Sequence, residues 1–382
     1  MGELGTVSPN SWDGSPNLNR EPNIRRVLAY RLGSLGDTVV ALPCYRLIAR
    51  LFPHAERRLL TNFPIHGKAP PSAAVLGSSG LFDGYMRYTV GTRRPGELLR
   101  LVWEIRRFRP DLLVYLTGIR PWKDVARDNA FFRLAGARRI VGIPASEQEL
   151  KHQLIPATGY FETEASRLAR LVSELGDAGV DDPANWSLSL NDAEHQTATN
   201  ALALLGPRPL IVCGPGTKMQ AKDWGQENWR VLLARLQFTY PTHALAMVGG
   251  NEEVSLAEFA SALWLGPKVN LCGRLTPRET AAVIERGHIF LGPDSGPMHL
   301  AASVGTPAVV AFTAAGIPGA WFPAGPLHQI VYHRTSCCGC RLETCTVEGR
   351  RCMTSITVDE MYAAAVRALS GQPGSSAAVV MP

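Results

Sequence analysis

Short apolar runs along the chain alternate with longer segments in which apolar residues recur every three or four positions. The short runs predict buried β-strands, and the segments with helical spacing predict amphipathic helices. The predicted strands are 26–32, 57–61, 85–90, 111–117, 139–143, 209–213, 244–248, 269–272, 288–292 and 308–312. The predicted helices are 37–50, 96–108, 122–134, 161–175, 192–204, 226–238, 252–263, 277–286, 298–304 and 358–369.

This regular alternation of strands and helices is typical of parallel sheets that carry helices on both faces. A linker-like stretch at 180–191 interrupts it midway. We therefore expect the α/β class, with two doubly wound, Rossmann-like domains facing a cleft. The predicted parts are a disordered tail, an N-terminal domain, a C-terminal domain, and a closing helix with a tail, over residues 1–22, 23–186, 187–357 and 358–382.

The composition is that of an ordinary globular protein of two or three domains: 382 residues, 46% hydrophobic and 19% charged. No apolar run is long enough to span a bilayer, and the N-terminus lacks the apolar stretch of a secretory signal. We expect a protein that is cytoplasmic, or peripheral at the inner membrane. The net charge of +6 is spread along the chain and suits an anionic small substrate or an anionic membrane surface. No motif indicates a nucleic-acid partner.

A glycine-rich loop, Gly33-Ser-Leu-Gly-Asp37, joins the first predicted strand to a helix. In open parallel sheets, ligands bind beyond the carboxyl ends of the strands, where such loops lie. The loop places the carboxylate of Asp37 at the start of the helix. Taken alone, this placement favours a helix cap or a first-turn acid. The alternative is a functional carboxylate in the cleft.

A second loop of this kind, Pro293-Asp-Ser-Gly-Pro297, follows the predicted strand 288–292. Backbone N–H groups of Ser295 and Gly296 would open the next helix and can hold a diphosphate without a metal. Asp294 would face the same cleft and accept hydrogen bonds from sugar hydroxyls. His299 lies one turn further along, either near the ligand or only in packing. Ordinary turn chemistry is the competing interpretation.

Two of the six lysines, Lys218 and Lys222, follow the turn Gly214-Pro-Gly-Thr217. Cations beside such a turn suit a phosphate, although an exposed lysine is usually only solvated. The sequence has no Walker A lysine motif, no GxGxxG at the first strand and no DxD pair. These absences argue against phosphate-loop NTPases, classical dinucleotide dehydrogenases and a divalent-ion clamp on a nucleotide sugar.

Five of the eight cysteines crowd into sixteen residues. In a chain without a predicted signal peptide, such a cluster is more often a metal site than a disulfide framework. We expect a structural zinc or iron with four thiolate ligands and one extra cysteine, Cys338. The four expected ligands are Cys337, Cys340, Cys345 and Cys352. A full shell of four thiolates leaves no open position, so this metal is not expected to take part in catalysis. A reduced, metal-free loop is the alternative.

Several motifs occur together and in order. They are Arg31-Leu-Gly-Ser-Leu-Gly-Asp37 with Pro43, Gly214-Pro-Gly-Thr217 with Lys222-Asp-Trp224 and Trp229, Gly249-Gly250, Leu271-Cys-Gly-Arg-Leu275, and Gly292-Pro-Asp-Ser-Gly-Pro-Met-His-Leu-Ala-Ala302 with Gly305-Thr-Pro307. Over about residues 26–365 the chain thereby resembles the heptosyltransferases, glycosyltransferase family 9. The resemblance implies the GT-B fold, with an acceptor-binding N-terminal domain and an ADP-heptose-binding C-terminal domain. It also implies inverting transfer without a catalytic metal. Some members carry a similar cysteine-rich segment that binds iron.

The resemblance also implies roles for single residues. Asp37 would be the general base on the acceptor hydroxyl, and Leu275 would line the adenine pocket. Glu252 or Glu253 would face the ribose, and the spacing does not say which. The residues implied around the phosphates and the sugar are Thr217, Lys218, Lys222, Asp294, Ser295, Gly296 and His299. Those implied on the acceptor side are Arg31, Ser34 and Gly36.

Two positions depart from the family pattern. Tyr115-Leu116 stands where the family has Asp-Leu, and Lys222-Asp-Trp-Gly225 stands where it has Lys-Arg-Trp-Pro. These departures leave open both the local phosphate contacts and the acceptor, which is a lipopolysaccharide core, a protein hydroxyl or a small metabolite. Two other functions stay open as well. One is a GT-B transferase that uses a different nucleotide sugar, and the other is a nucleotide-sugar-binding module without transfer. The presence of Asp37 argues against the second.

Overall fold

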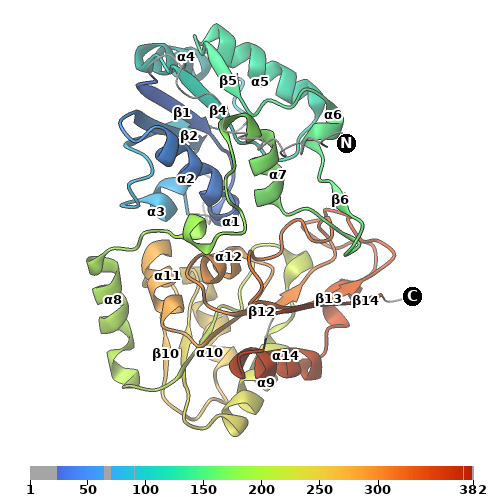
Figure 1. The fold of residues 1–382 in the computed structure, drawn as a ribbon. Helices are drawn as coiled ribbons and strands as arrows, with labels where there is room; N and C mark the ends of the chain where they lie inside the picture. The colour runs from blue at the N-terminus through green and yellow to red at the C-terminus, as the bar shows by residue number, and fades with distance from the viewer. Residues whose placement is uncertain (1–23, 64–69, 90, 373, 381–382) are drawn as a thin grey trace, which may run out of the picture.

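The computed structural model describes residues 24–63, 70–89, 91–372 and 374–380 (Figure 1). The expected N-terminal tail, 1–22, lies outside these residues. The described chain forms two large parallel sheets in separate halves of the molecule, one above the other in Figure 1. A small antiparallel pair, β6 (Leu154–Ile155) and β7 (Tyr160–Phe161), completes the strands.

The N-terminal sheet has the order β3-β2-β1-β4-β5. Its strands are β1 (Arg26–Tyr30), β2 (Glu56–Asn62), β3 (Gly84–Tyr88), β4 (Leu112–Tyr115) and β5 (Arg139–Val141). The C-terminal sheet has the order β10-β9-β8-β11-β12-β13-β14. Its strands are β8 (Leu210–Cys213), β9 (Ala244–Met247), β10 (Lys268–Asn270), β11 (Ile289–Pro293), β12 (Ala308–Phe312), β13 (Gln329–Arg334) and β14 (Ser375–Val380). In both sheets the strand order reverses beside the first strand, β1 or β8. In open parallel sheets, ligands bind at the carboxyl ends of the strands at such a point.

Helices connect the strands and cover the sheet faces (Figure 1). They are α1 (Leu35–Val39), α2 (Leu42–Leu51), α3 (Ser72–Leu76), α4 (Pro95–Phe108), α5 (Trp122–Leu134), α6 (Glu147–Leu150), α7 (Glu164–Leu171), α8 (Asp192–Leu202), α9 (Gln226–Thr239), α10 (Val254–Ala260), α11 (Pro277–Glu285), α12 (Gly296–Ser303), α13 (Arg351–Thr354) and α14 (Val358–Leu369). Short 3₁₀ turns are η2 (Ser173–Leu175), η3 (Pro183–Trp186), η4 (Ala203–Leu205), η5 (Gln220–Lys222) and η6 (Asn251–Glu253).

Alternate residues of β1 belong to two different apolar cores, because successive side chains of a strand point to opposite faces. Leu28 and Tyr30 pack with residues of α4 and α5 in a core of the N-terminal half alone. Val27 and Ala29 belong to a cluster that continues through α1 and α2 into the whole C-terminal half. The two halves therefore share one continuous apolar core.

The two predicted ligand loops meet where α1 packs against α12. A Cβ added to Gly36 would lie 3.0 Å from the His299 ring, and one added to Gly296 would lie 3.0 Å from Leu35 Cδ2. Both glycines therefore allow a close approach that a larger residue would obstruct. This contact brings the loop after β1 and the loop after β11 to one place between the domains.

The structure confirms the predicted α/β class with two doubly wound domains, and it differs in detail at several elements. The helix predicted over 37–50 is two helices, α1 and α2, because Pro43 has no N–H to donate to the carbonyl of Val39. The predicted C-terminal tail contains β14, which pairs with β13 at the edge of the sheet. The expected linker holds η3, whose Trp186 is buried against Val40 and Ala165. A domain boundary between residues 186 and 187 stays a prediction.

Candidate active site

A cavity of about 360 Å³ lies between the two halves, beside the contact of α1 with α12. The N-terminal half contributes Ser34, Leu35 and Pro70 to its lining. Most of the predicted donor-side residues line it: Thr217, Lys218, Lys222, Glu252, Glu253, Leu275, Asp294, Ser295 and Gly296. Residues from four separate loops of the C-terminal sheet thus converge on one space, as parallel strands that end at the same edge require.

Lys222 and Asp294 form an ion pair inside this cavity, with 3.0 Å between Nζ and Oδ2. Lys222 ends η5, the turn after β8, and Asp294 directly follows β11. Their side chains are 25% and 7% exposed, so a ligand in the cavity can reach the ammonium group while the carboxylate stays largely buried. The pair thus fixes a cation at the carboxyl ends of two neighbouring strands.

The start of α12 is left without a side-chain cap. Ser295 occupies the N-cap position in an extended conformation, but its hydroxyl accepts no bond from the helix. This Oγ atom is buried and makes no hydrogen bond to any described residue. A serine at this position normally accepts a backbone N–H. Helix N-termini attract anions, and the unpartnered hydroxyl adds one more donor for an anion in the cavity.

Glu253 inserts its carboxylate between two glycine-rich loops. It accepts a hydrogen bond of 2.7 Å from the backbone N–H of Gly250. Cβ atoms added to Gly216 and Gly249 would lie 1.9 and 2.3 Å from its carboxylate oxygens, so both positions need glycine for this arrangement. Burial raises the pKa of Glu253, with the nearby Glu252 acting in the same direction. Glu252 also lines the cavity, with its carboxylate beside Gly250.

Asp37 holds the turn that precedes it and remains partly accessible. Its Oδ2 atom accepts hydrogen bonds from the backbone N–H of Ser34 at 2.8 Å and from the Ser34 hydroxyl at 3.2 Å. A Cβ on Gly33, whose φ is 141°, would collide with Asp37 at 2.2 Å. The Asp37 side chain is 28% exposed, and its neighbours Ser34 and Leu35 line the cavity. Both interpretations of Asp37, the cap and the functional carboxylate, are compatible with this geometry.

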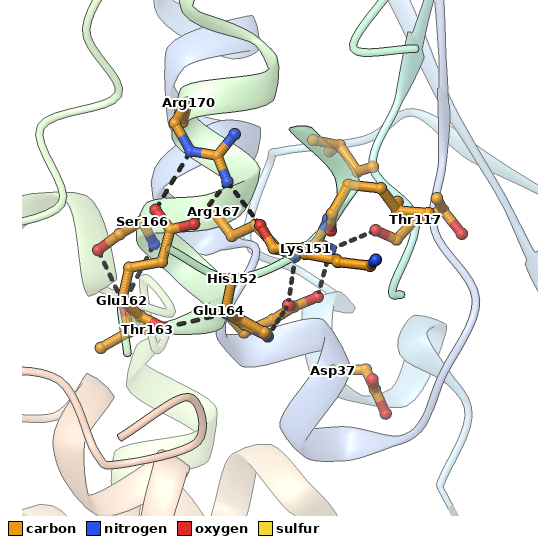
Figure 2. A network of polar contacts seen from close by, with 12 residues as sticks. Asp37, Thr117, Lys151, His152, Glu162, Thr163, Glu164, Ser166, Arg167 and Arg170 are labelled. Atoms are coloured by element: carbon orange, nitrogen blue, oxygen red, sulfur yellow. Dashed lines mark hydrogen bonds and ion pairs between the residues drawn. The ribbon is translucent and has the colours of Figure 1, made fainter. Parts of the chain in front are cut away.

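Figure 2 shows a network of polar contacts around Glu164, with Asp37 nearby. Arg31 joins this network to Asp37. Arg31 contacts Asp37 at 3.5 Å and Glu164 at 3.0 Å, and its Nε atom donates to the Asp37 carbonyl. Burial opposes the charge of Arg31, but Glu164 and Asp37 outweigh this and raise its pKa. Glu164 also accepts from Arg167 at 2.8 Å and lies 3.5 Å from His152. Although burial alone would raise the pKa of Glu164, its bonds to Arg167 and Arg31 lower it.

Sequence reasoning missed Glu164, Arg167 and His152. Glu164 and Arg167 stand three residues apart in a predicted helix, a spacing that usually indicates a solvent-exposed ion pair. In the structure both are buried under the carboxyl end of β4, and Arg167 donates to the carbonyl of Thr117 at 2.5 Å. One sequence signal could have found them. Arg31 lies in the predicted buried strand 26–32, and a buried arginine needs an acidic partner.

Four predicted site residues, Arg31, Gly36, Asp37 and His299, are not among the residues that line the cavity. Arg31 is 1% exposed and its guanidinium is used within the network, so it cannot contact an acceptor directly. Gly36 is covered by His299 in the contact of α1 with α12. His299 itself does not line the cavity and stacks edge-on against Trp321. Burial lowers its pKa to about 3, which keeps the ring neutral. Only Ser34 of the expected acceptor-side residues lines the cavity.

The expected four-thiolate metal site is not formed. Within the described ranges no three metal-ligating side chains are grouped so that they could hold an ion. The thiols have separate partners: Cys337 lies 3.4 Å from the Thr335 hydroxyl, Cys345 accepts a backbone N–H from Arg350 at 3.2 Å, and Cys352 lies 3.5 Å from the Thr313 hydroxyl. Close spacing in sequence did not make the four sulfurs converge.

The cysteine-rich segment instead packs against the loop that carries Lys222. The backbone N–H of Ala221 donates to the Glu343 carbonyl at 3.0 Å, and that of Cys345 donates to Gln220 Oε1 at 2.9 Å. Arg350 forms an ion pair of 3.0 Å with Asp223. The segment therefore supports the loop that carries Lys222 from outside the cavity.

Among the described helices, none has both the length and the apolar character that crossing a membrane requires.

Comparisons with known proteins identify the family and the fold of the chain. The family model of glycosyltransferase family 9 (heptosyltransferase) matches residues 155–350, just over half of the chain. Lipopolysaccharide heptosyltransferase 3 of Escherichia coli is 23% identical over 306 residues, which cover 73% of this chain and 81% of that relative. A family 9 glycosyltransferase structure from Veillonella parvula aligns with a TM-score of 0.68 at 14% identity, covering 92% of this chain and 98% of the other. The E. coli ADP-heptose LPS heptosyltransferase II aligns with a TM-score of 0.61 at 16% identity, covering 90% and 98%.

Proposed function

Because the chain belongs to glycosyltransferase family 9, the heptosyltransferases, and has the GT-B fold, we propose that it transfers heptose from ADP-heptose to an acceptor hydroxyl. The transfer proceeds with inversion at the anomeric carbon and needs no catalytic metal. The observation that carries this proposal is the uncapped start of α12 beside the Lys222–Asp294 pair, in a cavity that both domains line.

The donor binds in the 360 Å³ cavity with its diphosphate at the start of α12. Lys222, the Ser295 hydroxyl and the helix N-terminus meet the phosphate charge there. When the sugar leaves, negative charge develops on the departing ADP, and these fixed groups stabilise it without having to reorganise. A cation and a helix N-terminus thus provide the stabilisation that a divalent ion supplies in other transferases.

The nucleoside binds at the other end of the cavity, between the loops after β9 and β10. Glu253 faces the ribose, because its carboxylate lies deep between Gly216 and Gly249 and its Oε2 atom alone is held by the backbone. Leu275 provides the apolar surface for the adenine, with Val248 and Pro277 beside it in the lining. The proposal thus chooses Glu253 rather than Glu252 for the ribose, a choice that the spacing alone leaves open.

Asp37 accepts the proton of the acceptor hydroxyl. It stands on the opposite domain from the diphosphate groups, one turn beyond the lining residues Ser34 and Leu35. Arg31 fixes the carboxylate at its buried side and leaves 28% of the side chain exposed. A base must reach the attacking hydroxyl directly, so closure of the two domains around donor and acceptor completes the site.

A nucleotide-sugar-binding module without transfer is the second candidate. The capping bonds of Asp37 to Ser34 favour it, because they give the carboxylate a structural use. ADP, ADP-heptose, UDP-sugars and GDP-sugars should be compared in a thermal-shift experiment without magnesium. The proposal predicts that ADP and ADP-heptose raise the melting temperature most. Tighter binding of UDP- or GDP-sugars would contradict the donor assignment, and release of ADP from ADP-heptose separates transfer from binding alone.

A further inference from the structure

A second cavity, of about 600 Å³, lies between the domains on the side of the cysteine-rich segment. The N-terminal half contributes residues 119–121, 147, 150–152 and 161, and the C-terminal half contributes 317–318, 334, 338–339 and 341. It shares no lining residue with the 360 Å³ cavity. The donor site described above therefore does not account for it.

The lining of this second cavity is basic. Arg120 and Lys151 come from one domain, Arg334 and Arg341 come from the other, and Glu147 is the one acidic residue among the described residues of the lining. Arg120 is paired with Asp128 at 2.6 Å, and Lys151 is paired with Glu147 at 3.2 Å. Within the described part of the chain, Arg334 and Arg341 have no carboxylate within ion-pair distance. Two guanidinium charges facing the cavity are thus left uncompensated.

Arg341 is held in an unusual backbone conformation that keeps it at the cavity. Its φ is 58°, in the left-handed region that non-glycine residues rarely adopt. Its backbone N–H donates to the Ala315 carbonyl at 2.8 Å, and that of Gly339 donates to the Ala314 carbonyl at 2.8 Å. Such conformations persist where the surrounding structure imposes them, and they occur preferentially at ligand sites.

The second cavity adjoins the network behind Asp37. His152 lines the cavity and lies 3.5 Å from Glu164, which contacts Arg31, which in turn contacts Asp37. Burial lowers the pKa of His152, so the ring adds no charge of its own near neutral pH. On the other side of Asp37, Ser34 and Leu35 line the donor cavity. Three buried side chains, those of His152, Glu164 and Arg31, therefore connect the second cavity to Asp37.

We propose that the second cavity binds an anionic group, a phosphate or a carboxylate, carried by the acceptor. The planar guanidinium groups of Arg334 and Arg341 present paired N–H donors that match the oxygens of either anion. The site rests on the proposed function, because it takes the molecule whose hydroxyl Asp37 deprotonates. Under this proposal the cysteine-rich segment has two roles. It contributes Arg341 to acceptor binding, and it supports the loop that carries Lys222.

The test titrates full-length protein, saturated with ADP so that the first cavity is filled, with inorganic phosphate or with acetate at constant ionic strength. Melting temperature is the readout for wild type, for the variant Arg334→Gln/Arg341→Gln, and for the control Arg138→Gln/Arg286→Gln. All four arginines are exposed, so neither double variant should unfold the protein. Phosphate stabilises proteins in general because it is excluded from their surfaces. The quantity compared is therefore the difference in melting-temperature shift between the wild type and the two double variants.

We expect saturable stabilisation of wild type and control, and an apparent affinity at least about tenfold weaker in the cavity variant. Saturation by phosphate alone identifies a phosphate group, and saturation by acetate alone identifies a carboxylate. Identical, non-saturating curves for all three proteins would overturn the proposal. If ADP fails to bind, the proposed function fails, whereas the anion titration repeated without ADP still decides on the second cavity.

Discussion

Lys222 and Asp294, which are 72 residues apart in sequence, are joined by an ion pair of 3.0 Å where the loop after β8 meets the end of β11. The pair places a cation beside the uncapped start of α12. Asp294 holds the ammonium group in position, and under the proposed function the diphosphate of the donor would share it. This relationship is the basis for the predicted donor site.

Replacing Lys222 with Met should weaken ADP binding by about 10- to 100-fold, because a charge-assisted hydrogen bond is worth about 1.5–3 kcal/mol. Isothermal titration calorimetry without magnesium measures the effect. Lys123→Met, on the exposed surface of α5, is the matched control and should bind ADP like wild type. Equal affinities of the two variants would place the diphosphate elsewhere.

Ser295→Ala should leave the free energy of unfolding nearly unchanged and still weaken ADP binding. An N-cap serine normally contributes about 1 kcal/mol of stability, but the Ser295 hydroxyl makes no capping bond to lose. Thr357→Ala provides the contrast, since Thr357 does cap α14 by accepting the N–H of Glu360. That control should lose about 1 kcal/mol of stability and keep its ADP affinity. The opposite pattern in urea melts and ADP titrations would show that Ser295 has only a structural role.

Gly216→Ala tests the position of Glu253. A methyl group there would lie 1.9 Å from the Glu253 carboxylate, so the flexible side chain must move away from the ribose position. We expect a small change in melting temperature and a loss of ADP affinity of about tenfold, the value of one hydrogen bond to a charged group. Gly316→Ala, with no atom within 4 Å of the added carbon, should change neither quantity. Unaltered ADP binding by Gly216→Ala would remove Glu253 from the donor site.

Stability below neutral pH should depend on Glu164. Its pKa in the folded protein is lowered, so the folded state binds fewer protons than the unfolded chain in this range. The contribution of Glu164 to stability is therefore present above its ordinary pKa of 4.5 and is lost as the pH falls through the lower folded-state pKa. Urea melts from pH 7 to pH 3 should show a steeper loss for wild type than for Glu164→Gln.

The same variant should be about 3–5 kcal/mol less stable than wild type at pH 7, because it leaves Arg31 and Arg167 buried without their shared carboxylate. Glu174→Gln, whose exposed carboxylate pairs with Arg139, is the control and should change stability by less than about 1 kcal/mol. Parallel pH curves for Glu164→Gln and wild type would mean that another group controls acid unfolding.

The sequence predicted the sheets and the gathering of the cavity-lining residues for the same reason. Buried parallel strands such as β8 and β12 are continuous apolar runs, and the polar residues directly after them must gather at one edge. β13 escaped prediction because it carries polar residues. Its buried His333 is satisfied by Glu360 and Ser355, partners that only the folded chain brings near.

Side-chain direction was the part that sequence could not supply. His299 follows the predicted diphosphate residues by one helical turn, but packing against Gly36 and Trp321 turns it away from the cavity. The spacing of Cys337 and Cys340 suggested a metal site, yet spacing does not fix where the sulfurs point. In the sequence, Glu164 looks like a solvent-exposed helix residue. Its burial follows from the packing of α7 against the end of β4, which the sequence pattern does not show.

The most direct test of the proposed function is the rate at which wild type and Asp37→Asn release ADP from ADP-heptose with water as the acceptor of the heptosyl group, measured alongside the ADP affinity of both. Asparagine keeps the size of the side chain and its bonds to Ser34 but cannot accept a proton. We predict that ADP release falls by about 10²–10⁴-fold, while ADP affinity stays within about twofold, because most residues that line the proposed donor cavity belong to the other domain. Near-normal release by Asp37→Asn, or wild-type release no faster than that of the donor in buffer, would contradict the account.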